Sequence, residues 1–149
     1  MNNSFLEELR KRRGEMRGSI DAMELALSAP AAADLARWAE RVQASLTGLS
    51  SDLSQHIEIT EGPAGMYQEV LSSEPRLAGA VHRLKGEHDD IREQLDALIA
   101  RTGAVHNLED ATVIRDLGTD LLRSLVHHRQ RGADLVFEAY EFDVGGGET

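Results

Sequence analysis

The feature that most constrains the fold is a set of apolar residues at helical spacing between residues 77 and 98. Neighbouring members lie three or four residues apart, so in an α-helix they form one stripe along a single face. No segment of the chain alternates apolar and polar residues as a β-strand would. The chain is therefore predicted to be all-α. The stripe consists of Leu77, Val81, Leu84, His88, Ile91, Leu95 and Leu98.

Three other segments carry apolar stripes, and residues that end or cap helices separate them. Ser28–Pro30 ends the first helix, and Gly62–Pro63 ends the second, because proline lacks a backbone N–H and its ring clashes with the preceding turn. Asn107 can cap the start of the last helix. Four antiparallel helices in an up-and-down four-helix bundle are the simplest architecture. The bundle is predicted to cover residues 1–143, followed by a flexible tail over residues 144–149.

The charge and the residue usage exclude several classes of function. The chain has 16 Lys and Arg against 26 Asp and Glu, a net charge of -10, and so has no large basic surface for a nucleic-acid partner. It has no cysteine, which excludes disulfides and thiolate metal sites. No signal peptide and no stretch of membrane-spanning length is visible. We expect a cytoplasmic protein with neither a membrane nor a nucleic-acid partner.

Histidines occupy a place in three of the apolar stripes. His56 lies in the second stripe, His88 in the third, and helical phase places His128 rather than His127 in the fourth. Each imidazole that is buried without a partner costs on the order of one to three kcal/mol. A metal ion bound by all three would remove that cost. We therefore predict that the three histidines meet in one layer of the bundle and bind a metal.

One acidic residue lies close to this layer along the chain. Glu61 directly precedes the Gly62–Pro63 break, which would free the backbone to turn the carboxylate inward as a further ligand. In the alternative arrangement no metal binds, and an inward arginine pairs with a carboxylate in a buried polar cluster. The residues available for that cluster are Arg13, Arg131, Glu61 and Asp134.

The segments that carry these histidines resemble the hemerythrin family, in the branch of HHE cation-binding proteins. LSQHIEITE (53–61) resembles the second helix of the family, LKGEHDDI (84–91) the third and LVHHRQRGADLVFEAYEFD (125–143) the fourth. The resemblance implies a four-helix bundle that holds two bridged irons and binds dioxygen, nitric oxide or peroxide.

Three positions that carry ligands in the family hold other residues here. Met16 stands in place of the first-helix histidine, and Thr60 and Gly132 lie where carboxylates follow His56 and His128. Three histidines and one carboxylate would suit a single metal, with open volume beside the small residues. The predicted metal ligands are His56, Glu61, His88 and His128, and the predicted pocket-lining residues are Met16, Thr60 and Gly132.

Two functions are compatible with the sequence. The first is a hemerythrin-like protein that binds, senses or reacts with dioxygen, nitric oxide or peroxide through one or two metal ions, with iron expected. The second is a metal-free protein of the same fold that binds a partner protein or a small molecule. No Ser-His-Asp arrangement or glycine-rich phosphate loop is visible, which argues against a hydrolase. The sequence leaves open whether the chain is an enzyme and whether it forms a homodimer.

Overall fold

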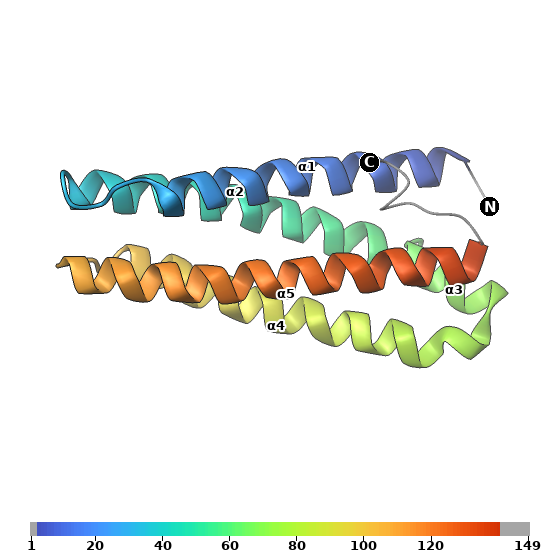
Figure 1. The fold of residues 1–149 in the computed structure, drawn as a ribbon. Helices are drawn as coiled ribbons and strands as arrows, with labels where there is room; N and C mark the ends of the chain where they lie inside the picture. Colours follow the sequence, from blue (N-terminus) through green and yellow to red (C-terminus); the bar gives the residue numbers. More distant parts are fainter. Residues whose placement is uncertain (1–2, 141–149) are drawn as a thin grey trace.

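Residues 3–140, with side chains from residue 7 onward, are described by the computed structural model, and this part of the chain is all-helical. The all-α prediction is confirmed. Four long helices lie side by side (Figure 1): α1 (Asn3–Ser28), α2 (Leu35–Glu61), α4 (Ala78–Thr102) and α5 (Leu108–Tyr140). The short helix α3 (Met66–Ser73) and the 3-10 turn η1 (Pro75–Leu77) connect α2 to α4. The predicted tail and the predicted boundary at residue 143 lie outside the described residues.

The helix ends follow local signals in the sequence. Helix α2 ends at Glu61, directly before Gly62–Pro63, as predicted. Its start is capped by Asp34, whose carboxylate accepts a hydrogen bond from the backbone N–H of Arg37 at 3.1 Å. Asn107 precedes α5 and accepts the backbone N–H of Asp110 at 2.9 Å, while the Asp110 carboxylate accepts that of Asn107 at 3.2 Å. The predicted cap at Asn107 is therefore confirmed.

The core is built from the apolar stripes of the four long helices. All seven members of the stripe between residues 77 and 98 are buried, as the periodicity predicts. The buried residues form two clusters along the bundle, one spanning the four long helices and the other at the end covered by α3. The three stripe histidines lie between these clusters. Their apolar neighbours on either side along the helices are Leu53, Leu84, Ile91, Leu125 and Leu135.

The chain connections place this histidine layer near one end of α2. The α1–α2 and α4–α5 connections lie at the same end of the molecule, and α3 lies at the other (Figure 1). His56 is five residues from the last residue of α2, so the layer lies toward the α3 end. Within residues 3–140, no helix combines the length and apolar character that crossing a membrane requires.

Candidate metal centre

Three histidines from three helices meet in one layer of the core. The ring centroids of His56 and His88 are 5.0 Å apart, those of His56 and His128 5.4 Å, and those of His88 and His128 4.6 Å. One ring nitrogen from each lies within 4.8 Å of the others, and the Nε2 atoms of His56 and His128 are 3.3 Å apart. The three histidines therefore converge as their stripe positions predicted, and they could hold a metal ion.

The burial of the histidines distinguishes these three from the rest. His88 is 1% exposed and His128 5%, and His56 is half-buried. His127, the neighbour that helical phase argued against, is exposed. The other two histidines, His82 and His106, are also exposed. The structure thus agrees with the choice of His128 over His127 as the inward residue.

A carboxylate stands behind each of the two most buried rings. The Nδ1 atom of His88 contacts the Glu61 carboxylate, and Nδ1 of His128 lies 2.8 Å from Oε1 of Glu87. When each Nδ1–H donates to its carboxylate, the Nε2 atom of the same ring carries the free lone pair. Nε2 of His88 is buried and has no hydrogen-bond partner. This is the arrangement in which a carboxylate fixes the tautomer and orientation of a metal-binding histidine.

Glu61 therefore occupies a different place from the predicted one. The sequence interpretation makes it a metal ligand, whereas its carboxylate contacts the Nδ1 edge of His88. The group of side chains close enough to share a metal, among the described residues, contains the three histidines and no carboxylate. The Gly62–Pro63 break ends α2 directly after Glu61, as expected, but the carboxylate contacts the His88 ring instead of joining the group of three histidine nitrogens.

Glu87 is a site residue that the sequence interpretation missed. It directly precedes His88, so the helical rotation of about 100° per residue turns it from the core layer toward a neighbouring helix. There its two carboxylate oxygens accept hydrogen bonds from His128 on α5 and from the Arg131 guanidinium. The available signal was an acidic residue directly before a stripe histidine, a pattern that also occurs in exposed positions.

The electrostatic environment keeps the three imidazoles neutral. Burial lowers the pKa of His56 well below its usual value, and the neighbouring His88 and His128 lower it further. Burial also lowers the pKa of His88, against the opposing effect of Glu61. It lowers the pKa of His128 to about 4, although Glu87 acts in the opposite direction. Neutral imidazole is the form that binds a metal, so the site needs no deprotonation at neutral pH.

A cavity of about 40 Å³ lies beside His56 and His128. The predicted pocket residues Met16, Thr60 and Gly132 all line it, and the structure brings them together from α1, α2 and α5. A Cβ atom added at Gly132 would meet only Nη1 of Arg13, at 4.0 Å, so this side of the cavity is open. The Thr60 hydroxyl donates a hydrogen bond to the backbone carbonyl of His56 at 2.8 Å, so its proton is already used within α2.

Tyr67 of α3 forms another wall of the cavity, and the sequence interpretation did not single it out. Its ring stacks on that of His88, with the centroids 6.0 Å apart and an interplanar angle of 17°. Burial raises the pKa of Tyr67, so its hydroxyl stays protonated and can donate a hydrogen bond. Tyr67 lies beyond the Gly62–Pro63 break. The helical periodicity of α2 does not extend across this break, so it could not predict that the Tyr67 side chain points to the site.

The contacts of Arg131 and Asp134 differ from those of the metal-free alternative, in which an inward arginine would pair with Glu61 or Asp134. Arg131 pairs with Glu87, and Asp134 accepts a hydrogen bond from Gln130 at 3.0 Å. Arg13 lines the cavity, where its charge helps to lower the pKa of His56. The resulting ion pair, between Arg131 and Glu87, lies behind His128 and leaves the three-histidine layer intact.

Comparisons with known proteins assign neither a family nor a function to this chain. No family model, curated protein or solved structure matches the chain. The resemblance to hemerythrins therefore stays a prediction. Function has to be inferred from the three histidines, the carboxylates behind them and the cavity beside them.

Proposed function

We propose that this chain is a hemerythrin-like, up-and-down helical bundle that binds one metal ion through His56, His88 and His128. The remaining coordination position binds, senses or reacts with a small ligand such as dioxygen, nitric oxide or peroxide. The observation that carries the proposal is the buried Nε2 atom of His88, which has no hydrogen-bond partner while Glu61 holds the opposite side of the same ring.

The energetics of the layer support a bound ion. A buried polar atom without a partner costs about 1–3 kcal/mol, and here it belongs to a ring whose centroid lies 5.0 Å from that of His56 and 4.6 Å from that of His128. One metal ion would satisfy His88 and its two neighbours together. The Glu61–His88 and Glu87–His128 pairs supply the outer hydrogen bonds that metal-binding imidazoles generally make.

The ligand set favours one ion over a bridged pair. Two irons joined by carboxylates would need acidic side chains where this chain has Thr60 and Gly132, and the carboxylates of Glu61 and Glu87 contact ring nitrogens instead. Three protein ligands with an adjoining cavity leave a coordination position for an exogenous ligand. Imidazole suits iron, zinc, copper and nickel, and binding of dioxygen requires a redox-active member of this set. We propose iron on the basis of the family resemblance.

Metal content per chain tests the proposal. Elemental analysis of the purified protein and titration with Co(II), followed by visible absorption, should give one ion per chain. His88→Ala and His128→Ala should abolish binding, because two imidazoles with an open cavity beside them are a much weaker site. The matched controls are His82→Ala on α4 and His127→Ala on α5, which remove exposed imidazoles and should bind like the parent.

The outcomes separate the proposed function from its alternatives. Two ions per chain would restore the two-iron interpretation. A folded parent protein that binds no Co(II), iron or zinc at saturating concentrations would refute the metal site and favour the metal-free binding module.

A further inference from the structure

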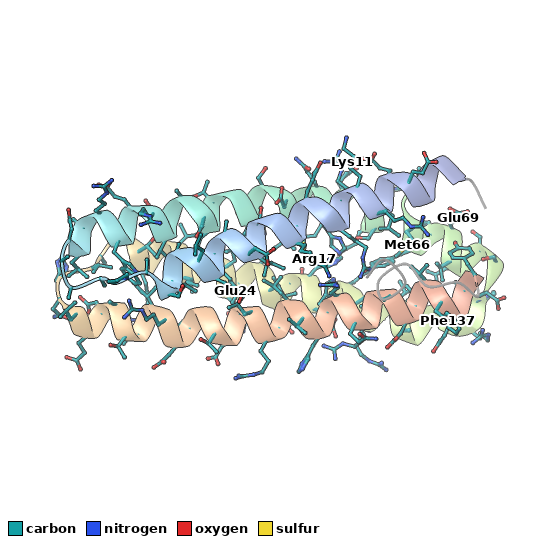
Figure 2. All side chains as sticks on the ribbon, turned by 45° about the horizontal axis from the view of Figure 1, so that its top comes forward. Lys11, Arg17, Glu24, Met66, Glu69 and Phe137 are labelled. Atoms are coloured by element: carbon teal, nitrogen blue, oxygen red, sulfur yellow. The ribbon has the colours of Figure 1, made fainter. Side chains whose placement is uncertain are left out.

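Two methionines line the cavity beside the histidine layer. Met16 comes from α1, where it is half-buried, and Met66 is the first residue of α3. Figure 2 labels Met66 between α1 and α5, toward the end of the bundle that carries α3. Thioethers are soft, polarisable groups, and a hydroperoxide oxidises them directly to polar sulfoxides. The two sulfurs therefore give the cavity wall a reactivity that needs no metal.

Contact with the cavity separates Met66 from the other buried methionine. Met66 and Met23 are 3% and 0% exposed. Met23 packs in the apolar cluster that spans the four long helices and does not line the cavity. Met66 belongs to the cluster at the α3 end and does line it. A reagent that enters the cavity therefore reaches one of these two buried thioethers and not the other.

The size and the walls of the cavity restrict which oxidant can enter. A volume of about 40 Å³ has room for roughly three water-sized groups. Hydrogen peroxide, with two heavy atoms, fits this space, whereas tert-butyl hydroperoxide, with six, exceeds it. Most of the lining residues are apolar, so an uncharged oxidant enters at a lower desolvation cost than a charged one.

Helix α3 depends on few side chains for its attachment to the bundle. It is eight residues long, and its buried residues are Met66, Tyr67 and Val70. An isolated helix of this length is unstable in water, so packing has to hold it. Gly65 precedes it and offers no side-chain hydrogen bond to cap its first turn. A change at Met66 therefore acts on one of the three side chains that keep α3 in place.

The surroundings of Met66 are poorly suited to a sulfoxide. Apart from Tyr67, the residues that share its cluster are apolar. The hydroxyls of Tyr67 and Thr60 share a hydrogen bond, and Thr60 already donates to the backbone carbonyl of His56. A polar oxygen buried in such a place destabilises the packed state. Oxidation of Met66 therefore favours a state in which α3 has left the bundle.

We propose that Met66 is an oxidation site: a small hydroperoxide enters the cavity, converts the thioether to a sulfoxide and thereby releases α3 from the bundle. A sulfur lone pair attacks one peroxide oxygen, so that an S–O bond forms and the O–O bond breaks. The sulfur loses two electrons to the peroxide, and the departing oxygen takes the proton of the transferred one and leaves as water. Release of α3 withdraws the Tyr67 ring from His88. The proposal goes beyond the proposed metal binding and does not depend on it.

The rate of oxidation at each methionine tests the route through the cavity. The full-length protein, freed of metal with a chelator, is treated with hydrogen peroxide or tert-butyl hydroperoxide. Mass spectrometry of tryptic peptides follows the reaction, since cleavage after Arg17 and Arg41 places Met16, Met23 and Met66 in separate peptides. Rates measured in urea, where the chain is unfolded, correct for the intrinsic reactivity of each oxidant.

Hydrogen peroxide should oxidise Met66 in the folded protein about tenfold faster than Met23 or more, because only Met23 has to wait for the core to open. The preference should disappear with tert-butyl hydroperoxide, which does not fit the cavity. Equal rates at Met66 and Met23 with hydrogen peroxide would overturn the proposal. A preference of the same size with both oxidants would also overturn it, since Met66 would then be reached by local unfolding.

Hydrogen exchange of the α3 amides tests the release of the helix. Treatment with hydrogen peroxide should raise their exchange rate about 10- to 100-fold. Met66→Leu keeps the apolar volume but cannot be oxidised, so its α3 amides should not respond, whether or not Met16 reacts. Met23→Leu is the matched control and should respond like the parent. Met66→Gln introduces a permanent polar group and should raise the exchange rate without peroxide.

The results separate the parts of the proposal and leave the metal site to its own test. Oxidation of Met66 without faster exchange in α3 would overturn the release of the helix. A response in Met66→Leu equal to that of the parent would assign the effect to another methionine and would overturn the proposal as well. Should Met66→Gln fail to fold by circular dichroism, the comparison of the parent with Met66→Leu still decides. Because the protein is metal-free throughout, none of these outcomes bears on the number of ions bound per chain.

Discussion

Replacing Glu87 with glutamine tests whether the carboxylate behind His128 contributes to metal binding. Oε1 of Glu87 accepts from Nδ1 of His128 at 2.8 Å, and Oε2 accepts from Arg131. Glutamine keeps the length of the side chain and one acceptor oxygen but removes the negative charge. The imidazole then becomes a weaker electron donor to a metal at Nε2, and the Arg131 guanidinium loses its ion pair.

The expected magnitude follows from how little water reaches this side chain. Removing a hydrogen-bonded carboxylate from behind a metal-binding histidine weakens metal affinity about 10- to 100-fold, or about 1.4–2.7 kcal/mol. The Glu87 side chain is only 15% exposed, so water screens its charge little and the upper half of that range applies. The metal-free protein should lose less, about 1 kcal/mol, because a charge-assisted hydrogen bond is replaced by a neutral one.

Isothermal titration with Zn(II) or Co(II), in competition with a chelator of known affinity, measures the change in dissociation constant. Glu93→Gln is the control, since Glu93 is exposed on the same helix six residues further along. The role assigned to Glu87 would be refuted if Glu87→Gln bound metal within about twofold of the parent while His128→Ala bound none.

Two further predictions concern acid and the open side of the cavity. Burial lowers the folded-state pKa of His56, His88 and His128. Below about pH 6.5 the histidines of the unfolded chain therefore take up protons before those of the folded chain do. The free energy of unfolding of the metal-free protein should fall as the pH drops through this range. His128, with its pKa of about 4, should account for a loss of about 3 kcal/mol of unfolding free energy by pH 4. An unfolding free energy from urea denaturation that stayed constant from about pH 8 to 4 would contradict this. Gly132→Glu should raise metal affinity about tenfold or more by placing a carboxylate one turn from His128, where only Arg13 lies within 4.0 Å of the new Cβ. The control is Gly132→Ala, which should gain about 0.5–1 kcal/mol of stability. Equal metal affinity in Gly132→Glu and Gly132→Ala would show that residue 132 does not face the site.

The helices and their buried faces could be read from the sequence because helical periodicity is a local property. The stripe that begins at Leu77 is buried throughout, and α2 and α5 end and begin where Gly62–Pro63 and Asn107 indicate. The same reasoning applied to the histidines. Leu53 and Leu125 fix the phase of their helices, so the inward position of His128, and the outward one of His127, follow from residue spacing alone.

The partners of the polar side chains could not be read in the same way. Glu61 and Glu87 each hold an imidazole on a different helix, and which imidazole they reach depends on the rotation and offset between packed helices. Spacing within one helix contains no information on that offset. An expected ligand, Glu61, therefore proved to contact the Nδ1 edge of His88, and Glu87 was not recognised at all.

The sequence by itself determined that the chain is helical and that three imidazoles lie on apolar faces, since both follow from a repeat of 3.6 residues along a single helix. Only the tertiary structure decided that these imidazoles meet within 4.8 Å, that two carboxylates stand behind them, and that Arg17 and Arg129 from α1 and α5 line the cavity beside them. The physical reason is that a side chain's direction is set by its own helix, whereas its neighbours are set by how the helices pack.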